Sequence, residues 1–232
     1  MCGRIGQFSP WQVFADPFSD HFGAAAPMPA DARPRFNVGP GTRAVVMHAG
    51  GDVRRTWWGY RPHWAVDRKV PQMINARADK IVSATWKPLL RAGRVIVPAD
   101  CWYEWVKDEA GKQPYLLHAR DGAALFLAGL TNVAPDGMSG PRDAEHGAGM
   151  VDGVVIVTDA SDAGMVDIHD RRPVALSAAD AQHWLDPDTS VEHAAEIART
   201  ASRPIADFEW FKVSRAVNDA RHDDPDLIRP IA

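Results

Sequence analysis

Short apolar runs broken by Gly, Pro and Asp dominate the first two thirds of the chain. They are rich in β-branched and aromatic residues, which favour strands over helices. We expect strands at 44–48, 53–60, 94–97, 114–118, 125–130 and 154–158. This pattern predicts a mixed β-sheet.

Helical patterns are fewer and lie mostly toward the carboxyl terminus. We expect helices at 83–91, 177–185 and 191–200, and Ser177 followed by Asp180 resembles a capping box at the start of the second. Residues 132–153 are rich in Gly, Asp and Pro without hydrophobic periodicity, which predicts a long mobile surface loop between two strands. The predicted class is α+β.

Length and composition are those of a globular protein with one domain. The 232 residues include 46% hydrophobic residues and nine tryptophans, enough for a sizeable core, so disorder of the whole chain is excluded. No run is long and apolar enough for a membrane span, and the amino terminus lacks the apolar stretch of a signal peptide. We therefore expect a cytoplasmic protein that does not enter a membrane.

Charge and cysteine content narrow the function further. The two cysteines, Cys2 and Cys101, fit neither a disulfide framework nor a zinc-ligand pattern, so we expect free thiols and no metal or cofactor. A net charge of -4 argues against non-specific coating of nucleic acid. Any nucleic-acid site must be a local basic cleft.

A cysteine at position 2 gains a second reactive group when the initiator Met1 is removed. Cys2 then carries a free α-amine, with an ordinary pKa of about 7.7 to 8.0, beside a thiol of pKa about 8.5. An aldehyde can form an imine with the amine, and the thiol can then close a five-membered thiazolidine ring. A cysteine can also follow the initiator methionine by chance. Taken alone, the position of Cys2 favours chance over a reactive role.

The segment at 95–105, VIVPADCWYEW, places Glu104 among three aromatic residues just after an apolar strand. A carboxyl that the aromatics desolvate has a raised pKa and suits proton transfer near neutral pH. A solvated Glu on the outer face of a strand fits the pattern equally well.

Two further segments combine polar groups that suit catalysis or phosphate binding. IHDRRPVAL at 168–176 offers His169 as an acid or base and Arg171 as a phosphate ligand, and INARADK at 74–80 offers Asn75 and Arg77. Taken separately, His169 is equally well explained as an ordinary surface histidine, and residues 74–80 as an ordinary polar turn.

Aromatic residues cluster in WWGYRPHW at 57–64. We assign most of Trp57 and Trp58 to the core, whereas Trp64, which follows a proline, is the better candidate for stacking on a base.

Eight segments in this order resemble the SRAP family, the SOS-response-associated peptidases. They are MCGR, RFNVGP, WWGYRPHW, NARAD, VPADCWYEW, FLAGL, VIVTDA and IHDRRPVAL. The resemblance as a whole runs from Cys2 to about Asn218. The resemblance implies a single SRAP-type domain over 1–232, α+β, with a mixed β-sheet or barrel-like core and flanking helices.

The resemblance also implies a chemical activity. A member of this family is expected to grip single-stranded DNA, and its amino-terminal cysteine forms a thiazolidine with the ring-opened sugar of an abasic site. The crosslink shields the lesion, in a lyase-like reaction without a cofactor. Single-stranded DNA that contains abasic sites would be the partner of a monomer that joins the nucleoid during DNA damage.

Position by position, the resemblance assigns roles to eight residues. The catalytic set that it implies is Cys2, Asn75, Glu104 and His169, and the DNA-binding set is Arg4, Trp64, Arg77 and Arg171. In these roles Glu104 accepts a proton from the amine, His169 assists ring opening, and Asn75 orients Cys2.

Three positions depart from the family pattern. Asp79 stands where Glu is more frequent, Arg172 where Met is usual, and Cys101 where a small residue is common. Arg172 is either an extra phosphate ligand or a solvent-facing charge, and we expect Cys101 to be a structural thiol.

Two other functions compete with DNA capture. Cys2 with His169 and Glu104 also suits a cysteine peptidase that cleaves its own amino terminus, although only Met1 lies upstream of Cys2. A DNA-binding module without bond formation would use the arginines and tryptophans and leave Cys2 without a role.

Overall fold

The chain folds into an α+β structure, seen in a computed structural model that describes residues 2–19, 29, 32–134, 137–142, 148–161, 165 and 168–231. The described strands form three sheets. The first has the order β15 (Phe208–Lys212), β8 (Gly111–Ala119), β7 (Cys101–Asp108), β1 (Ile5–Gln7) and β2 (Arg35–Val38), all antiparallel.

The second sheet is mixed, as expected. Its order is β13 (Arg171–Pro173), β12 (Val154–Ala160), β9 (Leu125–Thr131), β6 (Arg94–Ala99), β3 (Arg43–His48) and β4 (Val53–Trp57). Two more strands join it, β14 (Ala175–Leu176) antiparallel to β9 and β5 (Asn75–Arg77) parallel to β12. The third sheet is the pair β10 (Gly140–Pro141) and β11 (Val151–Asp152).

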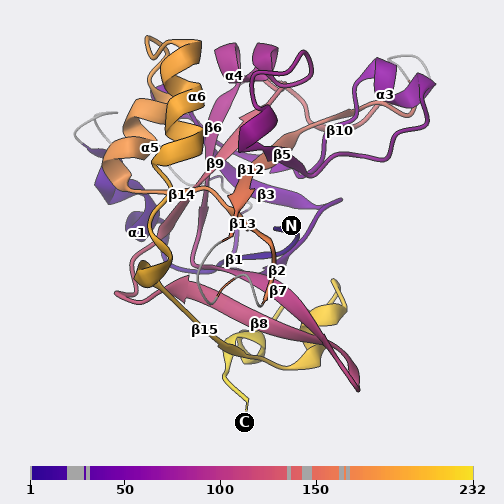
Figure 1. Cartoon of the computed structure of the whole chain (residues 1–232), viewed down its shortest axis with the longest axis vertical. Coiled ribbons are helices and arrows are strands. Elements are labelled where there is room, and N and C mark those ends of the chain that lie inside the picture. Colours follow the sequence, from indigo (N-terminus) through magenta and orange to yellow (C-terminus); the bar gives the residue numbers. More distant parts are fainter. Residues whose placement is uncertain are drawn as a thin grey trace.

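The two larger sheets enclose one hydrophobic core. Ile5, Trp102 and Leu117 from the five-stranded sheet meet Val97 and Ile156 from the mixed sheet, all essentially inaccessible to solvent. The amino terminus of the chain lies between these sheets (Figure 1). The described strands therefore pack as two layers and do not close into a barrel.

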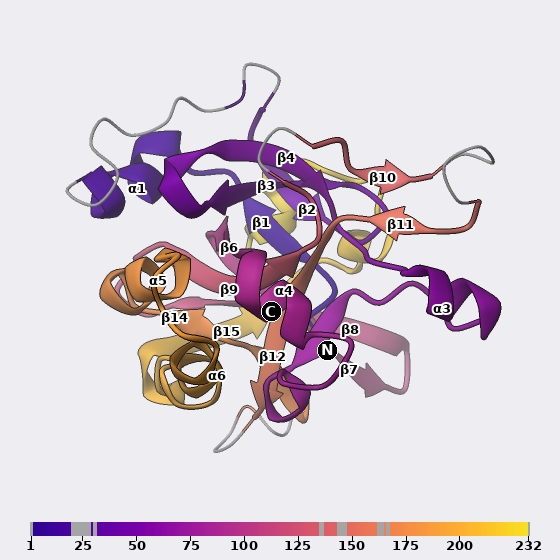
Figure 2. The same ribbon diagram turned by 90° about the horizontal axis from the view of Figure 1, so that it is seen from above.

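Helices cover the other face of the mixed sheet. They are α1 (Trp11–Ala15), α4 (Lys87–Ala92), α5 (Ala178–Leu185) and α6 (Val191–Thr200). Figure 2 shows α5 and α6 together at one side of the molecule, whereas α3 (His63–Asp67) and the β10–β11 pair project at the other. No helix in the described part of the chain is long and apolar enough to cross a membrane.

The carboxyl-terminal segment covers the outer face of the five-stranded sheet. Val213, Val217 and Leu227 pack there against Tyr103 and Leu116. Each larger sheet is thus covered on both faces over its central part. This explains why β6, β9 and most of β12 are continuous apolar runs rather than alternating ones.

The predicted strand at 53–60 ends earlier than expected, at Trp57. Gly59 adopts a φ of 147°, and a Cβ there would lie 1.5 Å from the Gln72 side chain. The regular pairing with β3 ends before this glycine, and Trp58 and Tyr60 make only isolated bridges to Val154 and Met73.

The expected loop at 132–153 contains structure that the sequence did not reveal. The β10–β11 pair lies within it, and the Arg43 guanidinium donates hydrogen bonds to the Ser139 hydroxyl and carbonyl. Strands this short leave no hydrophobic period. Residues 135–136 and 143–147 of the predicted loop lie outside the described residues, so its expected mobility stays a prediction.

The helix ends follow the local signals. The Ser177 hydroxyl accepts from the Asp180 backbone N–H at 3.1 Å, which confirms Ser177 as the N-cap of α5. The Asp180 carboxylate accepts from the Ser177 hydroxyl at 2.6 Å, in place of the Ser177 backbone N–H bond that a full capping box has. The helix predicted at 83–91 begins at Lys87, because residues 83–86 form turns and Pro88 fits a first helical turn.

A buried arginine joins two helix ends beneath the mixed sheet. Arg94 donates to Leu90 O at the end of α4 at 2.7 Å, and to Trp184 O and Asp186 O at the end of α5 at 2.7 and 2.6 Å. These carbonyls are among those that a helix leaves without partners. A cation here also faces the negative ends of two helix dipoles.

Replacing Arg94 with methionine is expected to lower the free energy of unfolding by about 2–4 kcal/mol, because it leaves several buried carbonyls without donors. Chemical denaturation measures this loss. Arg91→Met, at an exposed position of α4, is the matched control and should change stability by less than about 0.5 kcal/mol. An equal, small effect in both variants would contradict the capping role.

Candidate active site and nucleic-acid interface

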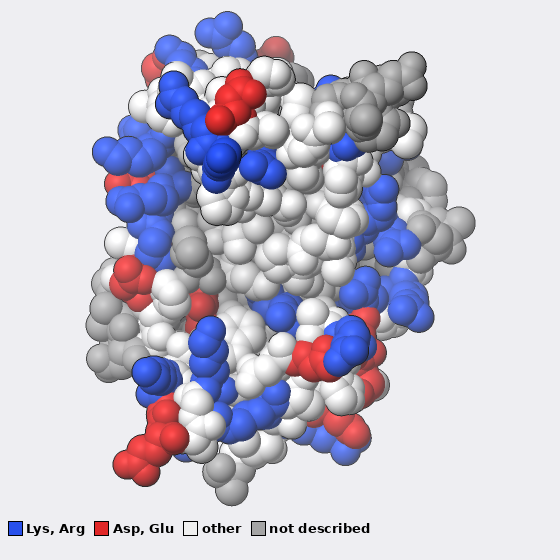
Figure 3. All heavy atoms as spheres, turned by 90° about the vertical axis from the view of Figure 1, so that its right-hand side faces the viewer, with Lys and Arg blue, Asp and Glu red and all other residues white. Residues whose placement is uncertain are grey.

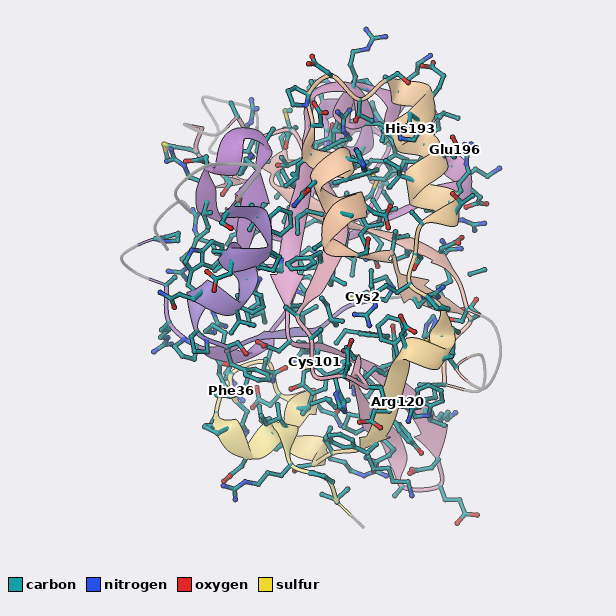
Figure 4. All side chains as sticks on the ribbon, turned by 90° about the vertical axis from the view of Figure 1, so that its left-hand side faces the viewer. Cys2, Phe36, Cys101, Arg120, His193 and Glu196 are labelled. Carbon is teal, nitrogen blue, oxygen red and sulfur yellow. The ribbon has the colours of Figure 1, made fainter. Side chains whose placement is uncertain are left out.

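Cys2 reaches the core through the pairing of β1 with β7. Ile5 lies opposite Trp102, and the Tyr103 N–H donates to Arg4 O at 3.0 Å. Continuing this register brings Glu104 level with Gly3, next to Cys2. Figure 4 shows Cys2 in the interior, whereas His193 and Glu196 lie far from it on α6.

The Cys2 side chain is fully buried. Burial raises the pKa of its thiol, and the negative charge of Glu104 raises that pKa further. A proton is therefore held on the sulfur at neutral pH. The amine that Met1 removal would create is the stronger first nucleophile under these conditions.

Asn75 connects the mixed sheet to Cys2. It lies on β5 opposite Ile156 of β12, and its Nδ2 donates to Cys2 O at 3.0 Å and to Ile156 O at 3.4 Å. Its Oδ1 is buried without a hydrogen-bond partner in the described part of the chain. An acceptor in that state suits an N–H or O–H that arrives with a bound substrate.

Glu104 is buried, which decides between the two environments considered for it. Its side chain is 2% exposed, and it lies on the inner face of β7 with Trp102, whose ring contacts Phe208 edge-on. Burial raises the pKa of Glu104 to about 8, and the nearby Asp170 acts in the same direction. A carboxyl with this pKa can give or take a proton near neutral pH.

His169 precedes β13 and is half-buried. Its Nδ1 lies 3.0 Å from the Arg171 backbone N and 2.8 Å from Asp170 Oδ1. It accepts from the amide when the ring is neutral and donates to the carboxylate when the ring is protonated. Burial lowers the pKa of His169, which favours the neutral ring at pH 7.

Two of the candidate arginines lie on strands that pair with β12, near Thr158. Arg77 is opposite Thr158 in the parallel pairing with β5, and the Arg171 guanidinium donates to Thr158 O at 2.6 Å. Thr158 is buried and anchors Arg171, a role that nothing in the sequence indicates beyond its place in the segment VIVTDA. The two guanidinium groups, here called the candidate phosphate clamp, carry the donors with which arginine binds phosphate.

Arg4 and Trp64 occupy different surroundings. The Arg4 guanidinium donates to Asn37 Oδ1 at 2.6 Å and to Val217 O at 2.9 Å, so part of its hydrogen-bonding capacity serves the fold. Trp64 is 38% exposed on α3, with the Arg68 guanidinium 5.9 Å from its ring. This helix projects from the body of the molecule (Figure 1).

Arg4 also lines an open pocket of about 510 Å³ beside Gly3, together with Trp105 and Lys112. The Arg4 guanidinium lies 5.8 Å from the Trp105 ring, a cation–π geometry. Figure 3 shows an uncharged central surface bordered on several sides by Lys and Arg. Local basic groups are thus compatible with the acidic net charge.

The two expectations for Arg172 are both wrong. Its side chain is buried, and its guanidinium donates to Arg203 O at 2.7 Å, so it is neither a phosphate ligand on the surface nor a solvated charge. Cys101 is buried on the opposite face of β7 from Glu104, and burial raises the pKa of its thiol, as expected for a structural cysteine.

The structure therefore brings Cys2, Asn75 and Glu104 together between the two larger sheets. His169, Arg77 and Arg171 lie on or next to β5 and β13, which both pair with β12. Fold and site define an α+β protein with a candidate cysteine centre at its amino terminus. A sequence model described as "SOS response associated peptidase (SRAP)" matches residues 1–220. The chain belongs to the SRAP family.

Named relatives extend over the same length. The chain is 34% identical over 235 residues to "Abasic site processing protein YedK" of Escherichia coli, covering all of both chains. It is 30% identical to YoaM of Bacillus subtilis, covering 98% of this chain and 97% of that protein. It is 28% identical to HMCES of Gallus gallus, covering 86% of this chain and 67% of that protein. YoaM and HMCES are also named as abasic site processing proteins.

Solved structures agree with this fold. A phage-related protein from Bordetella bronchiseptica is 38% identical with a TM-score of 0.72, covering 92% of this chain and 95% of that one. A protein from Bacteroides thetaiotaomicron has a TM-score of 0.74 over the full length of both chains at 18% identity, and shows the fold alone.

Proposed function

We propose that this chain captures abasic sites in single-stranded DNA through a covalent thiazolidine on Cys2 after removal of Met1. The observation that carries the proposal is the contact of Asn75 with Cys2 O at 3.0 Å beside a buried Glu104 whose pKa is about 8. The relatives named as abasic site processing proteins support the same substrate.

The reaction begins on the α-amine of Cys2. The amine attacks the aldehyde carbon of the ring-opened sugar, and loss of water leaves an imine. The thiol then adds across the C=N bond, so that sulfur bonds to carbon and the proton passes to nitrogen. One water is released overall, and no redox cofactor is needed.

Glu104 and His169 move protons in this scheme. The carboxylate form of Glu104 takes a proton from the attacking amine, and its acid form donates to the departing hydroxyl. His169, held neutral, assists opening of the sugar ring. The free Oδ1 of Asn75 accepts from the nitrogen of the adduct while its Nδ2 holds the Cys2 carbonyl.

The DNA backbone binds outside this centre in the same proposal. Arg77 and Arg171 hold phosphates near Thr158, Arg4 contributes its remaining donors, and Trp64 stacks on a base. An unpaired strand is required because the sugar must reach a cysteine buried between two sheets.

The peptidase alternative receives less support from the electrostatics. A cysteine protease needs a thiolate beside an imidazolium. The pKa of the Cys2 thiol is raised by burial, and burial lowers the pKa of His169, which opposes both ionised forms.

The proposal is tested by intact-protein mass after incubating Met1-processed protein with single-stranded DNA that bears one abasic site. The expected adduct has the mass of protein plus DNA minus one water. Undamaged DNA of the same sequence should give no adduct. Absence of any adduct, with removal of Met1 verified in the same spectrum, would sink the proposal.

A further inference from the structure

Arg77 already holds an anion of the protein itself. Its Nε donates to Asp79 Oδ1 at 2.9 Å and its Nη2 to Asp79 Oδ2 at 2.7 Å. This is the two-bond geometry in which a guanidinium also binds phosphate. The carboxylate thus occupies one hydrogen-bonding edge of the proposed phosphate ligand.

Asp79 influences the second arginine as well. Arg77 pairs with Thr158 through the backbones of β5 and β12, and the Arg171 guanidinium, from β13, donates to Thr158 O. Arg77 holds the pKa of Asp79 down at about 2, and the positive charge of Arg171 acts in the same direction. At neutral pH Asp79 is therefore ionised and offsets part of the positive charge at the clamp.

The ion pair with Asp79 is weak enough for DNA to displace. The side chains of Arg77 and Asp79 are 57% and 48% exposed. Ion pairs between exposed groups contribute little to stability because water screens them and both side chains lose freedom. A phosphate that arrives at Arg77 competes with a carboxylate on equal geometric terms.

Phosphate contacts cannot tell damaged from undamaged DNA, since both strands carry the same backbone. Every increase in phosphate affinity stabilises complexes with intact DNA, which is present in large excess over lesions. Discrimination between abasic and undamaged DNA improves when non-covalent binding is weak, because only the abasic strand then gains stability from the covalent bond to its aldehyde.

We propose that Asp79 is a specificity-determining residue that competes with phosphate for Arg77 and so weakens binding of undamaged single-stranded DNA. The inference rests on the proposed function and deepens it. Asp79 does not touch the reacting atoms, so capture of an abasic site at saturating DNA proceeds without it.

The test compares Asp79→Asn with Asp52→Asn by fluorescence anisotropy on undamaged single-stranded DNA across a range of salt concentrations. Asp52 is the matched control, because it also pairs with an arginine two residues further along the chain. It lies just before β4, and its carboxylate accepts one hydrogen bond from Arg54 Nε at 2.9 Å. Both variants change net charge by the same amount.

Asp79→Asn is expected to tighten binding of undamaged DNA by about twofold to fivefold at low salt. The slope of log affinity against log salt should steepen by about 0.7, the value for one further phosphate contact on a single strand. Asp79→Glu, which restores the charge, should return both quantities to those of the wild type. In competition with excess undamaged DNA, Asp79→Asn should crosslink a smaller fraction of abasic DNA.

Equal affinities for Asp79→Asn and Asp52→Asn would overturn the inference. Weaker binding by Asp79→Asn would overturn it too, because Asp79 would then orient Arg77 for phosphate rather than compete with it. These outcomes are separate from the proposed function: an adduct in wild-type protein with unchanged affinity in Asp79→Asn contradicts the inference alone, whereas no adduct in any variant contradicts the proposed function.

Discussion

Cys2→Ala is expected to abolish the adduct with abasic DNA, and Cys2→Ser is expected to reduce its stable yield by about 10²-fold or more. Alanine keeps the α-amine and allows at most a reversible imine. Serine offers a hydroxyl, which is a far weaker nucleophile than a thiol toward the imine carbon. Intact mass, measured with and without borohydride to trap the imine, separates the two stages of the reaction.

Cys101→Ser is the matched control for these variants. Cys101 is the other cysteine of the chain, also buried, and lies on the opposite face of β7 from Glu104. Its replacement should leave the adduct yield unchanged. Protein that retains Met1 should behave like Cys2→Ala, because its α-amine belongs to another residue. Full-yield adducts in Cys2→Ala without borohydride would contradict the thiazolidine.

Glu104→Gln is expected to slow crosslinking by about 10²-fold and to remove a pH dependence centred near the pKa of Glu104, about 8. Below pH 8 the wild-type carboxyl is mostly protonated and acts as an acid, and above pH 8 it is mostly ionised and acts as a base. Single-turnover rates from pH 6 to 10 measure this transition. An unchanged pH profile in the variant would contradict the assigned role.

Stability supplies the control for Glu104→Gln. The pKa of Glu104 is raised from its ordinary value of 4.5 to about 8, so the folded protein binds the proton more tightly than the unfolded chain does. Stability at this site is therefore fully present below about pH 4.5 and falls as pH rises toward 8. Glu104→Gln should be as stable as the wild type at low pH and more stable above pH 8. A slow but stable variant excludes misfolding as the cause of the lost rate.

Much of the architecture was predictable because its signals are local. The apolar runs at 94–97, 125–130 and 154–158 became β6, β9 and β12, and Ser177 caps α5 as its spacing with Asp180 predicted. The strands that carry the site were harder to predict. β5 and β13 are three residues each, too short for a hydrophobic period.

The family, the α+β class and the position of Cys2 follow from the sequence alone, because ordered segments and apolar runs can be read without knowledge of the fold. The contact of Asn75 with Cys2, the burial of Glu104 and the burial of Arg172 became evident in the folded structure. Burial and contact depend on strand register and on layers that join residues far apart in the chain. Those relations are set when the sheets pack, so no local pattern records them.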